Sequence, residues 1–257
     1  MAKDKTPRPS GGRQNDERGQ GRPAGQRILK TRVKSAKGRT TSSKRWLERQ
    51  LNDPYVAAAR SEGYRSRAAF KLIQMDERYH LLKPGMRVVD LGATPGGWSQ
   101  VAAARVRAGL PGGGEVVAID INAMEPVADV KFAELDFMAE EAEDVIRAML
   151  GGPADAVLSD MAAPATGHRQ TDHLRIMALC EAALAFAVDV LAQGGTFLCK
   201  VLQGGTEGEL LKVLKRDFRT IRHVKPEASR ADSSELYVLA TGFRGGKNEV
   251  TAEKDGA

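Results

Sequence analysis

Four charged residues of this 257-residue chain have the types and positions that acid-base chemistry needs. They are Lys71, Asp160, Lys200 and Glu235. Lys200 is the clearest case, because it is the one charge in the apolar run 195–202 and burying an ammonium group without a task is costly. Asp160 ends an apolar stretch and Glu235 opens another. The pattern predicts that the four side chains act together.

Such a set suits methyl transfer to a weak nucleophile, a ribose 2'-hydroxyl, whose proton must leave as it attacks. A lysine accepts that proton only when neutral; burial and a second cation lower a lysine pKa, whereas carboxylates oppose the shift. We therefore expect Lys200 to be the general base and Lys71 to be the neighbouring cation that contacts the substrate. Asp160 would orient groups near the methyl donor, and Glu235 near the hydroxyl. A buried ion-pair network without chemistry is the alternative.

A glycine-rich turn provides the second site. The run 88–100, VVDLGATPGGWSQ, is an apolar strand that ends in Asp90 and leads through glycines into a helix from about Ser99. Glycines let backbone N–H groups approach a ligand, and a helix N-terminus favours electron-rich groups. The spacing differs from the G-x-G-x-x-G fingerprint and lacks the Gly-Lys-Ser/Thr of a P-loop, which disfavours a nicotinamide dehydrogenase. An ordinary glycine turn that serves packing is the alternative.

The acids after the next strands suggest the ligand. The strand 116–119 ends in Asp120, whose carboxylate can bind both hydroxyls of a ribose. An adenosine-containing ligand without a diphosphate is indicated, and S-adenosyl-L-methionine (SAM) fits, with 90–92 near its methionine part. We expect Asp136 to meet the adenine amino group and Phe137 to line its pocket. The alternative for Asp136 is the N-cap of a helix over 138–150.

The elements around these residues predict an α/β fold. Further strands are expected over 130–135, 156–160, 195–202 and 235–241, and helices over 99–108, 138–150, 172–192 and 208–216. Ligands of an open parallel sheet bind beyond the carboxyl ends of its strands, so Asp90, Asp120 and Asp160 should converge on one crevice. A helical stretch over 64–73 would place Arg60, Arg65, Arg67 and Lys71 against RNA phosphates, with a solvated charged face as the alternative.

Charge and composition divide the chain into a tail and a body. Residues 1–45 hold 14 Lys/Arg against 3 Asp/Glu, which leaves 25 against 30 for the rest. Residues 1–42 are poor in large apolar side chains, so we expect a disordered basic tail that attracts RNA or only aids solubility. A domain over 43–245 and a polar tail over 246–257 follow. Two cysteines in apolar surroundings, no membrane-length apolar run and no signal-peptide core predict a cytoplasmic protein.

The sequence resembles the FtsJ/RrmJ (RlmE) family of 2'-O-ribose RNA methyltransferases from about 43 to 241. The resemblance rests on the glycine turn and on four further motifs. These are RSRAAFKL (65–72), LSDMA (158–162), KVLQG (200–204) and SRADSSELY (229–237). It implies a Rossmann-like SAM-dependent methyltransferase fold with a mostly parallel seven-stranded sheet and helices on both faces.

The resemblance also implies roles for particular residues. It places a Lys-Asp-Lys-Glu catalytic tetrad on the four charged residues above. The two cysteines do not have metal-ligand spacing, so no metal is expected. It implies SAM contacts at Gly96, Trp98, Asp120, Asp136 and Asp160. The bacterial branch that this chain looks most like modifies a uridine of 23S rRNA in the 50S particle, and we expect a monomer. A ribosome-assembly factor with little catalysis and a tRNA 2'-O-methyltransferase are the alternatives.

Overall fold

The computed structural model describes residues 40–164, 166–203 and 208–245. The basic tail lies outside these ranges except for 40–42, and so do Gly204 of the KVLQG motif and the tail 246–257. Contacts divide the chain between Asn52 and Asp53. In the first part, helix α1 (Thr41–Leu51) begins after Thr40, whose hydroxyl accepts the Ser43 N–H. The expected domain start at residue 43 stays a prediction.

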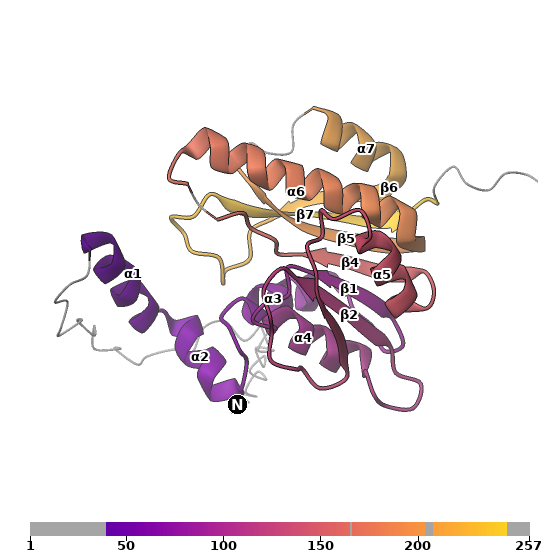
Figure 1. Ribbon diagram of the computed structural model, residues 1–257, viewed down its shortest axis with the longest axis horizontal. Coiled ribbons are helices and arrows are strands. Elements are labelled where there is room, and N and C mark those ends of the chain that lie inside the picture. Colours follow the sequence, from indigo (N-terminus) through magenta and orange to yellow (C-terminus); the bar gives the residue numbers. More distant parts are fainter. Residues whose placement is uncertain (1–39, 165, 204–207, 246–257) are drawn as a thin grey trace, which may run out of the picture. The chain divides into compact units, whose positions relative to one another are not determined.

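From Asp53 onward the chain is built on one seven-stranded sheet (Figure 1). Its strands are β1 (Arg87–Leu91), β2 (Glu115–Asp120), β3 (Val130–Glu134), β4 (Ala154–Ser159), β5 (Leu191–Leu202), β6 (Phe218–Val224) and β7 (Glu235–Phe243). Their order is β3-β2-β1-β4-β5-β7-β6, and β7 runs antiparallel to both of its neighbours while the remaining pairs are parallel. The expected mostly parallel, seven-stranded α/β fold is confirmed.

Helices cover both faces of this sheet (Figure 1). They are α3 (Ala69–Tyr79), α4 (Gly97–Val106), α5 (Ala142–Leu150), α6 (Arg169–Val190) and α7 (Glu209–Asp217), while α2 (Pro54–Glu62) packs on α3. Apolar residues of α3 and α4 form one core layer with Val88 and Leu158, and those of α5, α6 and α7 form the other with Val89 and Val157. Strand alternation explains this split. Within the described ranges, no helix is both long and apolar enough to cross a bilayer.

The helix expected over 64–73 begins later, at Ala69. Residues 64–68 are held instead by tertiary contacts, because the Arg65 N–H donates to the Gln100 side chain at 2.9 Å. The Trp98 indole N–H also donates to the Ala68 carbonyl at 2.9 Å. Hydrogen bonds to α4 therefore override the local helix propensity of residues 64–68, and the expected helix start at residue 64 was wrong.

Two further boundaries and one additional strand differ from the sequence expectations. Helix α5 starts at Ala142 rather than 138, since residues 138–141 form turns. Helix α6 ends at Val190, and the chain enters β5 at Leu191, which pairs with Ala154 of β4, so Gly194 lies within a strand. Strand β6 was not expected, because Arg219, Arg222 and His223 interrupt its apolar pattern. These are the side chains an edge strand tolerates.

Candidate active site

The four charged residues singled out from the sequence do meet. Lys71 on α3 forms an ion pair of 2.5 Å with Glu235 at the start of β7, and its Nζ lies 3.9 Å from Asp160 Oδ2. Lys200 on β5 lies 2.9 Å from Asp160 Oδ1 and also donates to the Asp160 carbonyl at 2.5 Å. Both lysines are buried, with 7% and 8% of their surface exposed. Asp160 therefore links the two ammonium groups.

Tyr237 joins this cluster, although the sequence reasoning gave it no role. Its hydroxyl lies 2.7 Å from Asp160 Oδ1 and 3.0 Å from Glu235 Oε1, and it accepts a hydrogen bond of 3.0 Å from Lys71. The antiparallel register places Tyr237 opposite Lys200. A position two residues after Glu235 shares its face of the strand, and this alternation was the available signal.

The cluster is electrostatically consistent with an ionised Asp160. Burial opposes the charged form, but the two lysines and the hydrogen bonds from Tyr237 and Lys200 outweigh it and hold the pKa of Asp160 below its usual value. Burial and the neighbouring carboxylates Asp160 and Glu235 raise the pKa of Tyr237 well above its ordinary value. Tyr237 is thus a neutral donor, and it can give its single proton to only one carboxylate at a time.

A cavity of about 550 Å³ opens at the carboxyl ends of β1, β2 and β4. Its walls come from the glycine turn, the loops after β2 and β3 and the segment that follows Asp160. They include Gly92, Thr94, Asp120, Ile121, Asn122, Asp136, Phe137, Met138, Asp160, Met161 and Pro164. Its volume is in the range that suits a cofactor-sized ligand. Asp120, Asp136 and Asp160 therefore lie in one cavity, and a contact of each with SAM stays a prediction.

The donor and acceptor groups of this cavity fit the adenosyl part of SAM. Asp120 accepts the Thr94 N–H at 3.0 Å on one oxygen and the Asn122 N–H at 2.9 Å on the other, which aims its carboxylate while leaving further lone pairs. Asp136 accepts the Met138 N–H at 2.9 Å. Its side chain thus caps a turn and lines the cavity beside Phe137. The alternative of a helix N-cap was wrong, because α5 begins at Ala142 with Glu141 as its N-cap.

The glycine turn requires a glycine at position 92. Gly92 has φ +77°, and a Cβ there would lie 2.9 Å from Met161 Cα and 3.0 Å from its N. We expect Gly92→Ala to destabilise the fold by about 2 kcal/mol and to weaken SAM binding, because backbone atoms must move. Gly151→Ala is the matched control, since Gly151 has φ +65° with open space around it. Equal effects of the two variants in denaturation and SAM calorimetry would contradict this account.

Gly96 and Trp98, implied by the resemblance, do not line the cavity. Gly96 has φ +107° and precedes α4, and a Cβ there would lie 2.9 Å from Val127 Cγ2. Trp98 is buried against the Tyr237 ring, with centroids 5.7 Å apart. Both support the turn from behind. A contact from either residue to SAM stays a prediction from the resemblance.

Asp90 does not join Asp120 and Asp160 in the cavity, so the expected convergence of the three acids was wrong. The physical reason is strand position: Asp90 lies within β1 on the α4 face, whereas Asp120 ends β2 and Asp160 follows β4. Its carboxyl is fully buried and accepts a hydrogen bond of 2.6 Å from Ser99. Its other oxygen has no partner among the described atoms.

Burial, opposed by the Ser99 hydrogen bond and aided by Asp160 and Asp120, raises the Asp90 pKa to about 7. The folded state then binds this proton more tightly than the unfolded state, so the resulting stabilisation is lost as pH rises from 4 to 7. We expect the parent to lose roughly 3 kcal/mol more than Asp90→Asn between pH 4.5 and 8 in urea denaturation. Asp144→Asn, at an exposed acid, should follow the parent. Equal slopes for parent and Asp90→Asn would contradict the assignment.

The basic stretch before Lys71 is only partly available to RNA. Arg67 pairs with Asp53 at 2.8 Å and donates to the Ala228 carbonyl at 2.6 Å. The Arg65 guanidinium donates to three backbone carbonyls. Arg60 on α2 is exposed. Arg65, Arg67 and Lys71 are therefore held by groups of the protein itself, and a contact of any of these four cations with RNA phosphates stays a prediction.

A mostly parallel seven-stranded sheet, a glycine turn after β1 and an acid-lined cavity beyond the strand ends define a Rossmann-like, SAM-dependent methyltransferase. The model of the FtsJ-like methyltransferases matches residues 64–243. The chain belongs to this family, whose members use SAM as methyl donor. The resemblance stated from the motifs and the expected cofactor are both confirmed.

Relatives and a solved structure agree with this assignment. The chain is 66% identical to a ribosomal RNA large subunit methyltransferase E of Xanthobacter autotrophicus over 85% of this chain and 86% of the relative. It is 60% identical to the protein of that name in Parvibaculum lavamentivorans, over 91% and 94%. A crystal structure of a ribosomal RNA methyltransferase from Plasmodium falciparum superposes with a TM-score of 0.63 at 29% identity, covering 71% of this chain and all of the other.

Proposed function

We propose that this protein transfers a methyl group from SAM to the 2'-hydroxyl of a uridine in 23S rRNA within the 50S subunit. The observation that carries the proposal is the double position of Asp160, which lines the SAM cavity and also pairs with Lys200. A methyl donor in the cavity and the proton acceptor Lys200 would therefore both lie next to the Asp160 side chain. The names of the relatives support large-subunit ribosomal RNA as the substrate.

Lys200 is the proposed general base. SAM, when bound, supplies a methyl group on a sulfonium, a good leaving group. With SAM held beside Asp160, the ribose oxygen would take the methyl group, S-adenosylhomocysteine would be left, and the Lys200 amine would accept the O–H proton. In the structure Lys200 pairs with Asp160, so the ammonium must first release a proton. Asp160 orients the amine through its bond of 2.9 Å.

Lys71 is the proposed substrate contact. Its ammonium is held by Glu235 at 2.5 Å and by the Tyr237 hydroxyl at 3.0 Å, which fixes its position next to Asp160. A cation there stabilises the negative charge that develops on the attacking ribose oxygen. Glu235 in turn accepts from Ser229 at 3.2 Å, which ties the loop before β7 to the site.

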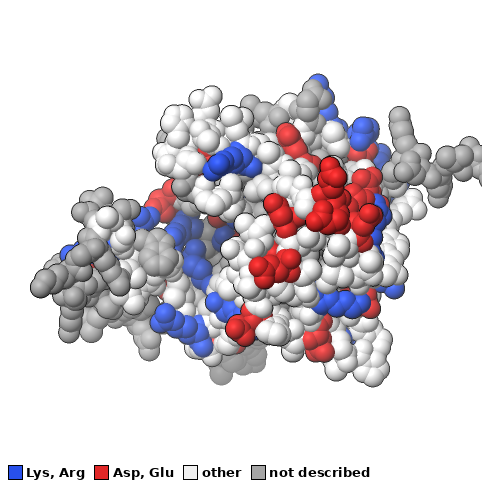
Figure 2. Space-filling model, viewed as in Figure 1, with Lys and Arg blue, Asp and Glu red and all other residues white. Residues whose placement is uncertain are grey.

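Surface charge favours RNA approach from the side of the catalytic cluster. Acidic side chains gather over α5 and the loop before it, including the exposed Glu140, Glu141 and Asp144 (Figure 2). Phosphates are repelled there, which leaves the side of α2, where Arg60 is exposed, for the approach of RNA. The basic tail lies outside the described residues. We propose that it adds salt-sensitive attraction to RNA, and that the protein works as a monomer in the cytoplasm, where its substrate is.

The proposal is tested by transfer of labelled methyl groups from SAM to purified 50S particles that lack their native methylation. We expect labelling of the 50S particle and slower labelling of the naked transcript. Of the four cations before and at Lys71 only Arg60 is exposed, so binding should depend on an RNA surface that is already folded. Binding of the particle without any labelling would favour an assembly factor. Labelling of tRNA in preference to the particle would favour the tRNA enzyme.

A further inference from the structure

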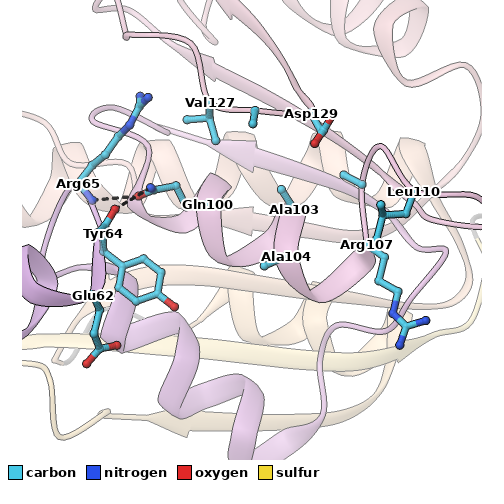
Figure 3. A pocket seen from close by; sticks show the side chains of 13 residues that line it. Glu62, Tyr64, Arg65, Gln100, Ala103, Ala104, Arg107, Leu110, Val127 and Asp129 are labelled. Atoms are coloured by element: carbon cyan, nitrogen blue, oxygen red, sulfur yellow. Dashed lines mark hydrogen bonds between the residues drawn. The ribbon is translucent and has the colours of Figure 1, made fainter.

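A second cleft of about 430 Å³ lies on the far side of the glycine turn. Residues 62–65, α4 and residues 127–129 line it, and Arg65 lies at one end with Gln100 beside it (Figure 3). The Gln100 amide fixes the main chain here, since it accepts from Arg65 N at 2.9 Å and donates to the Gly63 carbonyl at 3.1 Å. The Arg65 side chain therefore leaves from an anchored position.

The guanidinium of Arg65 joins two loops through their backbone. Its Nη1 donates to the carbonyl of Pro95 at 3.3 Å and to that of Glu125, and its Nη2 donates to the carbonyl of Pro126 at 2.6 Å. The aliphatic part of the side chain also packs closely, since a Cβ built on Gly96 would lie 3.2 Å from Arg65 Cδ. A planar fork of donors can satisfy several carbonyls at once, which a lysine cannot do.

The two loops that Arg65 joins continue directly into the walls of the SAM cavity. The glycine turn contributes Gly92 and Thr94, and the loop after β2 contributes Ile121 and Asn122. On the cavity side they are joined by Thr94, whose hydroxyl donates to the Asn122 carbonyl at 3.1 Å. Arg65 makes the matching connection at their far side. With both connections, the spacing of the two walls is fixed before the ligand arrives.

We propose that Arg65 is a positioning residue for SAM, which sets the distance between the glycine turn and the loop after β2 instead of binding an RNA phosphate. The inference rests on the proposed function only for its ligand, SAM. Pre-organised walls lower the ordering cost of binding, so loss of the connection weakens SAM affinity even though Arg65 does not line the SAM cavity. RNA affinity does not change, because the guanidinium is occupied by backbone carbonyls.

Two substitutions separate the two roles. Arg65→Lys keeps the positive charge but loses the fork, and Arg65→Gln loses the charge as well. A positioning role predicts roughly tenfold weaker SAM binding by calorimetry for both variants, with 50S affinity and its salt dependence unchanged. A phosphate contact predicts instead that Lys keeps, and Gln loses, 50S affinity, with SAM binding intact in both. Arg60→Lys is the matched control, because Arg60 is an exposed cation nearby in sequence on α2.

Thermal unfolding without and with SAM distinguishes weaker SAM binding from a general loss of fold stability. We expect both Arg65 variants to unfold near the parent temperature without SAM, and to gain less stability than the parent when SAM is added. Parent-like SAM affinity in Arg65→Lys would overturn the inference, and so would a large loss of stability without SAM. A parent protein that bound SAM but methylated no 50S particle would contradict the proposed function, and the calorimetric comparison of the Arg65 variants would still decide this inference.

Discussion

Lys200→Met should slow methyl transfer by about 10³-fold or more while the protein still binds SAM and the 50S particle. The loss follows from removing the proton acceptor, since positioned acid-base groups contribute about 10²- to 10⁴-fold to rates. Methionine is apolar and of similar length, so it suits the buried position on β5. Single-turnover transfer to 50S particles measures the chemical step, and SAM calorimetry measures binding.

Lys131→Met is the control for this substitution. Lys131 is an exposed residue of the edge strand β3, away from the lysine-carboxylate cluster. Its ammonium lies 3.4 Å from the Glu115 carboxylate. It should methylate at the parent rate. A Lys200→Met variant that also methylated at the parent rate would exclude Lys200 as the base. A variant that lost 50S binding along with methylation would place Lys200 in substrate binding instead.

Asp160→Asn should abolish most methyl-transfer activity. It should also weaken SAM binding, which substitutions of Lys200 or Glu235 should not do. Asparagine keeps the shape and an acceptor for Lys200 but removes the charge, which leaves two buried ammonium groups with Glu235 as the remaining carboxylate of the cluster. Breaking a buried ion pair in this way costs about 3 to 5 kcal/mol of folding stability. Urea denaturation, SAM calorimetry and methyl transfer measure the three effects separately.

The pH dependence of this variant provides a further check. Because the folded pKa of Asp160 is lowered, its charge stabilises the fold above the unfolded pKa, and that stabilisation is lost as pH falls through the folded value. Asp160→Asn should therefore lose less stability than the parent on acidification below pH 4.

Glu235→Gln is the matched control for the effect on SAM binding, since Glu235 holds Lys71 but does not line the cavity. Equal loss of SAM affinity in the two variants would contradict the double position of Asp160.

Much of the site could be predicted from single residues that break a local rule. Lys200 in an apolar strand and acids at the ends of strands are visible without a structure. The cost of burying a charge and the position at a strand end can be recognised from one segment alone, without knowing which other segments it contacts. Asp120, Asp136 and Asp160 lie in one cavity for this reason. Asp90 failed the same rule because it is level with Ala118 and Leu158, two residues before Asp120 and Asp160, where its side chain is fully buried.

Other features depend on contacts between segments far apart in the chain. Tyr237 joins the cluster through its register with Lys200, and Arg65 becomes a connection between loops only after the loops of β1 and β2 are brought together. Strand β6 forms because β7 offers it an edge, although its own sequence is mostly polar. Neither composition nor periodicity contains this information, so these parts could not be read from the sequence.

The proposed role of the lysine-carboxylate cluster is to take a proton from a ribose hydroxyl and not from a base. Digestion of labelled 50S RNA to nucleosides, followed by mass spectrometry, shows which position carries the methyl group. We predict a single labelled product, 2'-O-methyluridine, that is absent with Lys200→Met and present with Lys131→Met. A methyl group on a carbon or nitrogen of the base, formed at a comparable rate, would contradict the account.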